Sequence, residues 1–356
     1  MSVGQGTTPR TGTTPTGDTH PRPARRGLGR LVTGLGPYAL FVAALLLVPF
    51  VFTRLPPYTM SDGVLMMLLA VAALGLVPLT GYAGQVSLGQ AAFYGTGAYT
   101  TAILTVRYDQ SVWLSIVAGA AIAGLFAYLL GRALFRAAGH YLTLATIAVG
   151  LTLGVVVQQV DLTGRAEGLP GVTPLSLFGA DISDDVSFFY LAAGVLLVAT
   201  AVVRLVCRSL FARTLLAISD STVAAQSCGV NPAPLKRSMF VLAAILSSVA
   251  GSLYATWSGY VDASTLGLNV SLQLLIIVTV GGRRSVFGAA VGAFVVVSLV
   301  RFAKEWLPAV STHAGGQVEI IAYGLALILV LRLLPRGIVG GVVDLVRRLV
   351  PAARRT

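Results

Sequence analysis

The stretch Gly81-Tyr82-Ala83-Gly84-Gln85-Val86-Ser87-Leu88-Gly89-Gln90 decides the fold, because it lies in the middle of a long segment without charge. Between Asp62 and Arg107 stand 44 residues, none of which carries a charged side chain. A continuous helix of that length would rise about 66 Å, which is barely two crossings of a bilayer. The polar, glycine-rich centre must therefore lie at or inside the membrane boundary.

Two structures satisfy this constraint. Irregular backbone at membrane depth is tolerated only where it is buried in protein or lines a wet cavity. The segment near 81–90 is therefore either a tight helix–helix turn with close glycine packing or a broken, re-entrant helix beside a polar path.

Composition supports a membrane protein, with lipid as the solvent for much of the chain. Of the 356 residues, 56% are hydrophobic and 11% are charged, and the mean hydropathy is +0.84. Soluble domains carry about a quarter charged residues, so this chain cannot cover itself with a surface compatible with water. The 40 glycines fit the same interpretation, because small residues let transmembrane helices approach closely.

The expected fold is an all-α polytopic membrane protein of about ten transmembrane helices, with both termini inside. A helix needs roughly 20 apolar residues to cross a bilayer. With charged residues as boundaries, the predicted spans lie near 36–53, 63–80, 90–106, 111–131, 140–160, 187–204, 238–261, 267–282, 285–300 and 317–334.

The distribution of basic residues sets this orientation, because Lys and Arg gather in cytoplasmic loops. The expected outside loop 161–186 contains five acidic residues and only Arg165. The outside pair Arg301 and Lys304 is the main exception. The expected inside residues are Arg132, Arg136, Arg208, Arg213, Lys236, Arg237, Arg283, Arg284, Arg336, Arg347, Arg348, Arg354 and Arg355.

The expected organisation is a single membrane domain between two basic tails. Residues 1–30 are rich in Thr, Pro and Gly and predict a disordered cytoplasmic tail. Residues 31–340 form the transmembrane domain, with a large cytoplasmic loop at 205–237, and residues 341–356 form a second basic tail.

Three stretches together carry a resemblance to a known family. They are GYAGQVSLGQAAFYGTGAY (Gly81–Tyr99), ISDSTVAAQSCGVNPAPLKRSMFVLAA (Ile218–Ala244) running into SSVAGSLYA (Ser247–Ala255), and GGRRSVFGAAVGA (Gly281–Ala293) with LPRGIVG (Leu334–Gly340). The chain resembles the LivM-type permease subunit of branched-chain amino-acid ABC importers over roughly residues 60–340.

The resemblance implies a function and a set of partners. The subunit would form the translocation path for small apolar amino acids in a bacterial inner membrane. It would work with two cytoplasmic ABC ATPases, a second homologous permease and an extracytoplasmic solute-binding protein. Gln90 stands where the family often has histidine, and Arg283-Arg284 is more basic than usual. Urea and short-amide importers use closely related permeases and are the alternative.

The loop 205–237 predicts a short displayed helix. Asp220 or Ser221 suits the N-cap, Gly229 suits a left-handed C-terminal position, and Asn231-Pro232 ends the run. A helix of about two turns needs something to pack against. By resemblance it is the coupling helix that docks on an ATPase, although packing on its own bundle is the alternative. The coupling residues are Asp220, Ser221, Val223, Ala224, Ala225, Cys228 and Gly229.

Uncharged polar residues are the candidates for the path, because the predicted spans lack charges near their centres. Each candidate could instead be hydrogen-bonding glue between helices. The candidates are Gln85, Ser87, Gln90, Tyr94 and Tyr99. A weak likeness between Gly84-x-x-Ser87 and Gly282-x-x-Ser285 hints at two structural repeats.

Several other functions are disfavoured by the sequence. The two lysines, Lys236 and Lys304, lie in no P-loop motif, and the three histidines form no ligand cluster. We therefore expect no enzyme activity, cofactor or metal site in this chain. The net charge of +12 is scattered over loops and tails, which disfavours nucleic-acid binding. An ion-coupled secondary transporter is the remaining rival, but it would need a charged relay within its spans.

Overall fold

The computed structural model describes residues 41–43, 45–49, 59–135, 141–177, 180–182, 184–306, 324 and 338. The chain divides into a unit Met1–Ala43 and a unit Ala44–Thr356, and the second unit contains the helices and strands named below. Both expected tails, 1–30 and 341–356, lie outside the described residues. So do nearly all of the predicted span 317–334 and the basic residues Arg136, Arg336, Arg347, Arg348, Arg354 and Arg355.

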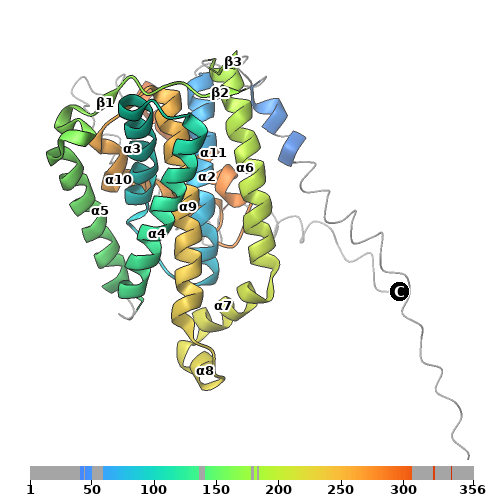
Figure 1. The fold of residues 1–356 in the computed structure, drawn as a ribbon. Helices are drawn as coiled ribbons and strands as arrows, with labels where there is room; N and C mark the ends of the chain where they lie inside the picture. The colour runs from blue at the N-terminus through green and yellow to red at the C-terminus, as the bar shows by residue number, and fades with distance from the viewer. Residues whose placement is uncertain are drawn as a thin grey trace, which may run out of the picture. The chain divides into compact units, whose positions relative to one another are not determined.

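Helices account for almost all of the described structure (Figure 1). Each predicted span from 63–80 to 285–300 coincides with a helix. The helices are α2 (Met60–Leu76) continuing into η1 (Val77–Tyr82), α3 (Gln90–Tyr108), α4 (Val112–Leu134), α5 (Tyr141–Gln159), α6 (Asp185–Arg208), α7 (Leu210–Asp220), α8 (Thr222–Ser227), α9 (Pro232–Ser258), α10 (Leu268–Gly281) and α11 (Gly288–Trp306).

Four of these helices are long and apolar enough to cross a membrane, and a bent pair brings the total to five within the described residues. The four are α2 with η1, α4, α6 and α9. The bent pair joins Thr143–Gln159 of α5 to Asp161–Glu167, which includes the short 3-10 helix η3 (Arg165–Glu167), at an angle of 87°. The chain is therefore a multi-pass membrane protein.

Short strands connect the loops at the end of the bundle where α2, α4 and α6 begin (Figure 1). β1 (Leu169–Pro170) pairs antiparallel with β4 (Tyr260–Val261), and β2 (Ser176–Leu177) pairs antiparallel with β3 (Ala180–Asp181). Two further 3-10 helices are η2 (Asp161–Thr163) and η4 (Ala263–Leu266).

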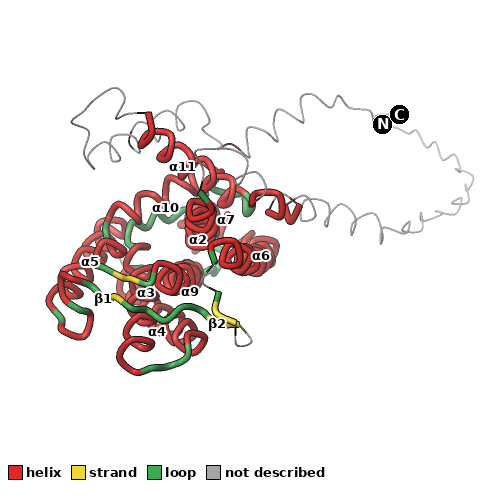
Figure 2. Tube along the Cα trace, turned by 90° about the horizontal axis from the view of Figure 1, so that it is seen from above, coloured by secondary structure: helices red, strands yellow, loops and turns green. Residues whose placement is uncertain are grey.

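The core is built around α9, which packs against α2, α3 and α4 (Figure 2). These helices approach closely because small residues stand at the crossings. A Cβ added at Gly97 of α3 would clash with the backbone carbonyl of Ser248, and one at Gly251 of α9 would clash with that of Tyr94. The two helices are thus held in backbone contact on both sides of one crossing.

Candidate functional site

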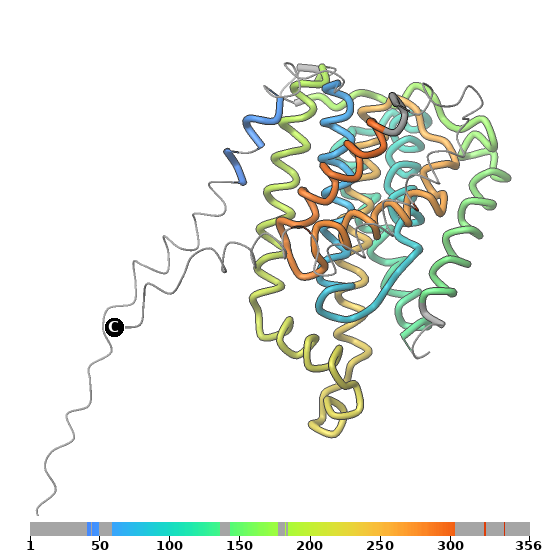
Figure 3. The backbone as a smooth tube through the Cα atoms, turned by 180° about the vertical axis from the view of Figure 1, so that it is seen from behind, coloured from blue at the N-terminus to red at the C-terminus, as the bar shows by residue number. Residues whose placement is uncertain are grey.

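The helix that begins with α2 is broken near the position predicted from the sequence. Its last turn, η1, is π-helical and contains Pro78 near its start. Proline removes a backbone donor, and π-helical turns are common at functional sites. Gly84 then adopts φ +64°, and the backbone from 83 to 89 is irregular until α3 begins at Gln90. Figure 3 shows this segment returning along the bundle from the end of η1 to the start of α3.

Side chains of α5 satisfy the irregular backbone. The Leu88 amide donates to Thr146 Oγ1 at 3.3 Å, and Thr143 Oγ1 donates to the Val86 carbonyl at 3.0 Å. Thr146 lies about 8 Å beyond Tyr141, at the helical rise of 1.5 Å per residue. The segment therefore packs against the first turns of α5, with Ser87 and Gly89 buried and Gly84 exposed. The choice between a tight turn and a re-entrant helix stays a prediction, since the segment has both irregular backbone and the close packing of Gly81 and Gly89 against neighbouring carbonyls.

The start of α3 meets the start of α10 inside the bundle. The Ala91 amide donates to Ser271 Oγ at 2.9 Å, and these residues belong to the first turns of their helices. The N-cap residues are Gly89 and Gly267, and neither provides a side-chain cap. The first amide groups of a helix lack carbonyl partners within it and carry partial positive charge. Two such helix starts converge here.

Ser87 and Gln90, both predicted path residues, lie together at this junction. Both side chains are buried, with 1% and 0% exposure. Gln90 Oε1 accepts from Ser247 Oγ at 3.0 Å, but Gln90 Nε2 and Ser87 Oγ have no hydrogen-bond partner. A buried polar group left unpaired costs about 1–3 kcal/mol. The junction therefore contains buried polar groups that make no hydrogen bond within the subunit.

The other path candidates are placed differently. Tyr94 is buried one turn further along α3, with its ring 5.8 Å from that of Tyr254. Tyr99 lies in a separate buried cluster with Leu169 and Val261 near the strands, and its hydroxyl has no partner. Gln85 is half-buried. The structure thus brings Ser87 and Gln90 together and leaves Tyr99 at the middle of α3, in a different cluster.

Several polar residues of the junction were missed by sequence reasoning. Ser247 of α9 bonds to Gln90, Ser252 Oγ donates to the Gly97 carbonyl at 3.1 Å, and Ser271 caps an amide of α3. Ser248 is also buried, and its hydroxyl has no partner. The repeated small residues in SSVAGSLYA were a usable signal, because small residues four apart mark helix crossings.

The second glycine-rich turn packs against the first. A Cβ at Gly81 would clash with the Arg283 carbonyl, and Arg284 Nε donates to the Gly81 carbonyl at 3.0 Å. Each turn contains a glycine with positive φ: Gly84 at +64° in the first and Gly282 at +110° in the second. Both precede helices of 19 residues, α3 and α11, which extends the likeness noted in the sequence to the local structure.

The loop between α6 and α9 displays the short helix α8. Ser221, and not Asp220, is its N-cap, with Oγ accepting from the Ala224 amide at 3.2 Å. Gly229 has φ +79° and nothing within 4 Å of its added Cβ. Val223 is 71% exposed, whereas Ala225 is buried. Asp220, Ala224 and Cys228 are exposed as well, so most of the predicted coupling residues face outward.

Charges separate between the two ends of the helical unit. The end that carries α7 and α8 (Figure 1) holds basic residues from several loops, and the opposite end holds most of the described acidic residues. The basic residues at the α8 end are Arg132, Arg204, Arg208, Arg213, Lys236, Arg237, Arg283 and Arg284.

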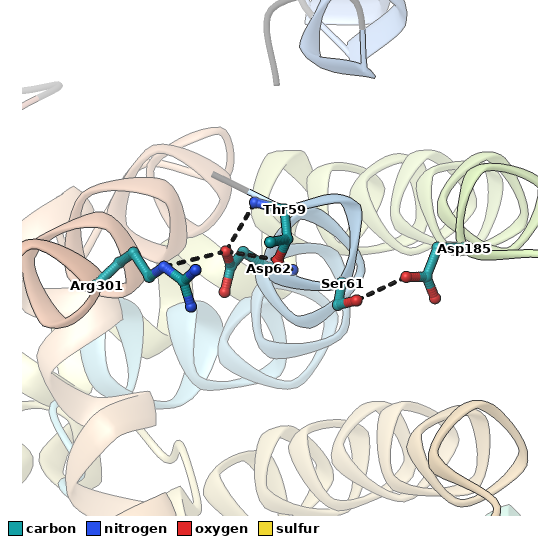
Figure 4. A network of polar contacts seen from close by, with 5 residues as sticks. All are labelled: Thr59, Ser61, Asp62, Asp185 and Arg301. Atoms are coloured by element: carbon teal, nitrogen blue, oxygen red, sulfur yellow. Dashed lines mark hydrogen bonds and ion pairs between the residues drawn. The ribbon is translucent and has the colours of Figure 1, made fainter. Parts of the chain in front are cut away.

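Arg301, an exception in the sequence pattern, has a local partner at the acidic end (Figure 4). Its Nε lies 3.7 Å from Asp62 Oδ2. That carboxylate also accepts from the backbone and hydroxyl of Thr59, which completes the capping box of α2. Nearby, Ser61 Oγ donates to Asp185 at 2.6 Å. Arg301 thus neutralises an acid that holds the start of a helix.

No group of three or more metal-ligating side chains occurs among the described residues. Cys207 and Cys228 are both free thiols. The residues gathered at the junction are hydroxyls, an amide and helix amides. Such groups can bind a polar solute by hydrogen bonds.

Comparison with known proteins assigns the chain to a family. Residues 63–334 match the family described as the permease component of the branched-chain amino acid transport system. The chain is 28% identical to the high-affinity branched-chain amino acid transport system permease protein LivM of Escherichia coli (strain K12), over 72% of this chain and 67% of that protein. It is 27% identical to the LivM of Salmonella typhimurium over the same shares. No solved structure matches. The chain belongs to the permease-component family of branched-chain amino acid transport systems.

Proposed function

We propose that this chain is the membrane permease subunit of an ATP-binding-cassette importer and forms part of the translocation path for branched-chain amino acids. The observation that carries the path assignment is the junction of α3 and α10. Buried hydroxyl and amide groups without partners lie there beside two helix starts without side-chain caps.

The chemistry of the junction suits a zwitterion. A carboxylate is attracted by the partial positive charge of helix N-termini and can accept from Ser87 Oγ and Gln90 Nε2. The described residues named at the junction are all uncharged, so none of them would hold a solute of net charge. In this proposal the segment near 81–90 moves during the transport cycle. The substrate then forms hydrogen bonds with the polar groups that have no partner in the present structure.

The exposed helix α8 supports the proposed coupling to ATPases. Val223 presents an apolar side chain at the tip of a basic loop, and an exposed apolar residue on a six-residue helix suits a protein partner. The proposed complex contains two cytoplasmic ATPases, a second permease and an external solute-binding protein. In it, Ser221, Ala224 and Gly229 shape the docking surface.

The proposed location is a bacterial inner membrane with the α8 end in the cytoplasm, as the positive-inside rule requires. A cysteine placed at Ser209, beside α7, is then protected from an impermeant maleimide in intact cells, and one placed at Gly171 is labelled. Labelling of Ser209→Cys from outside would reverse the orientation and remove the coupling role with it.

Reconstitution tests the function as a whole. The complete complex in proteoliposomes should accumulate leucine only with ATP and binding protein, and an ionophore should leave the uptake unchanged. Uptake that survives without ATPases and fails with the gradient would restore the secondary-transporter alternative. ATP-dependent uptake of urea with leucine excluded would keep the mechanism and replace the substrate.

A further inference from the structure

A pocket lies at the α8 end of the unit, between the end of α4 and the start of α9. Its volume is about 360 Å³, and it is separate from the junction of α3 and α10. Helix α4 lies beside α3 and α9 with one side open (Figure 2). The pocket residues are Tyr128, Gly131, Arg132, Phe135, Asn231, Ala233, Pro234 and Arg237.

The pocket is positively charged. The Arg237 guanidinium lies over the Tyr128 ring, 4.5 Å from its centroid, and its stem crosses Gly131 with Cγ 3.0 Å from an added Cβ. Arg132 is exposed at the rim. The two ion pairs of the described residues involve other arginines, so neither guanidinium is neutralised by a described carboxylate. The start of the 27-residue helix α9 adds the positive end of its dipole.

An apolar stripe leads from the pocket along α4. Residues at helical spacing on the open side of this helix are exposed and lack charge until the last turn. Val117 is 66% exposed and Leu125 is 61% exposed. The stripe consists of Leu114, Val117, Ala121, Leu125 and Tyr128, and it ends at Arg132.

The height of the pocket matches a membrane surface. Helix α4 has 23 residues and is apolar enough to span, so Arg132 in its last turn lies at the level of lipid headgroups. A ligand that fits both parts needs an anionic head for the two arginines and hydrocarbon for the stripe. A soluble anion would use only the pocket.

We propose that this pocket binds the phosphate-bearing headgroup of an anionic phospholipid, whose acyl chains lie along the stripe on α4. Arg132 and Arg237 pair with the phosphate, and Asn231 offers its side chain to the polar part of the headgroup. Basic pockets between helices at a membrane surface are suited to such lipids.

Lipid retention by the purified full-length chain tests the site. After extraction from vesicles of equal phosphatidylglycerol and phosphatidylcholine, native mass spectrometry should find phosphatidylglycerol retained in preference. Arg132→Gln should lower this preference about fivefold, which corresponds to one surface charge. Arg213→Gln, on exposed α7, is the matched control and should leave it unchanged. Arg132 is exposed at the rim, so its replacement should not disturb folding, and a monodisperse elution profile checks this.

Three results would overturn the proposal. They are equal retention of the two lipids, an equal loss in both arginine variants, and displacement of phosphatidylglycerol by inorganic phosphate alone. The last result would assign the pocket to a free phosphate. Loss of retention in Leu125→Asn, which alters only the stripe, would support the lipid.

Discussion

Gly97 in the bundle interior and Gly229 in the loop after α8 are both glycines, but different features of the structure require them. Gly97 lies on a regular helix, and a Cβ there would clash with the backbone carbonyl of Ser248. Gly229 has open space around it and needs glycine only because its φ is +79°. In the interior the neighbouring helix excludes a side chain, whereas in the loop the backbone conformation excludes it.

The largest effect is expected at the interior glycine. Gly97→Val should separate α3 from α9 and cost about 3 kcal/mol or more, because the obstacle is backbone and cannot rotate away. The measurement is the yield of monodisperse protein and its thermal stability in detergent. Gly194→Val is the matched control, since Gly194 lies on α6 with nothing within 4 Å of the added Cβ. Equal stability of the two variants would show that the crossing can open without cost.

The next largest effect is expected on transport, while the stability of the fold stays nearly the same. Gly229→Val should leave insertion and thermal stability nearly unchanged, because the strain of a left-handed residue is about 1–2 kcal/mol and local. Uptake per ATP hydrolysed by the reconstituted complex should fall about tenfold, since the end of the proposed coupling helix is reshaped. Gly229→Asn tolerates positive φ and should retain most uptake. Normal uptake in Gly229→Val would show that this turn does not transmit force.

The sequence predicted these two regions unequally well. The α8 loop was predicted closely, because caps, glycine and Asn231-Pro232 act through their immediate neighbours in the chain. The position of the irregular segment near 81–90 was also predicted, because the polar centre of 44 uncharged residues must lie at or inside the membrane boundary. The hydrogen-bond partners of this segment and of the start of α3 are Thr143, Thr146 and Ser271, which are remote in the sequence. No local rule places those residues.

The candidate site shows the same limit. Ser87 and Gln90 were chosen because they are polar within an apolar segment, and they meet in the structure. Tyr99 was chosen for the same reason, yet it packs with Leu169 and Val261 near the strands. Ser247 was overlooked because a serine in a helix of small residues is ordinary, and only the crossing of α3 and α9 brings it to Gln90.

A smaller effect on uptake is expected at Gln90 in the junction, and it distinguishes a role in packing from a role in transport. Gln90→Leu should leave thermal stability nearly unchanged, because it removes a buried Nε2 that has no partner but also the Oε1 that accepts from Ser247 Oγ. Leucine uptake by the complex should fall several-fold if this amide serves the substrate. The double variant Gln90→Leu with Ser247→Ala removes the hydroxyl left without its acceptor and controls for that loss. A marked drop in stability, with uptake falling in proportion, would make Gln90 an element of packing alone.

The smallest effects are expected at the acidic end of the bundle (Figure 4), where the Arg301–Asp62 pair is partly exposed to water. Arg301→Gln removes an ion pair of 3.7 Å at a partly exposed side chain and should cost less than about 1 kcal/mol. Asp62→Ala should cost more, about 1–2 kcal/mol, because it also removes the acceptor that caps the start of α2. Arg165→Gln breaks the exposed pair with Asp161 and should change thermal stability too little to measure.

The expected order of destabilisation is therefore Asp62→Ala, then Arg301→Gln, then Arg165→Gln, and all three changes should stay below that of Gly97→Val. If Arg301→Gln destabilised the protein as much as Asp62→Ala, the ion pair and not the cap would hold this end together, and the contrast between a backbone-packed interior and a weakly coupled surface would fail there.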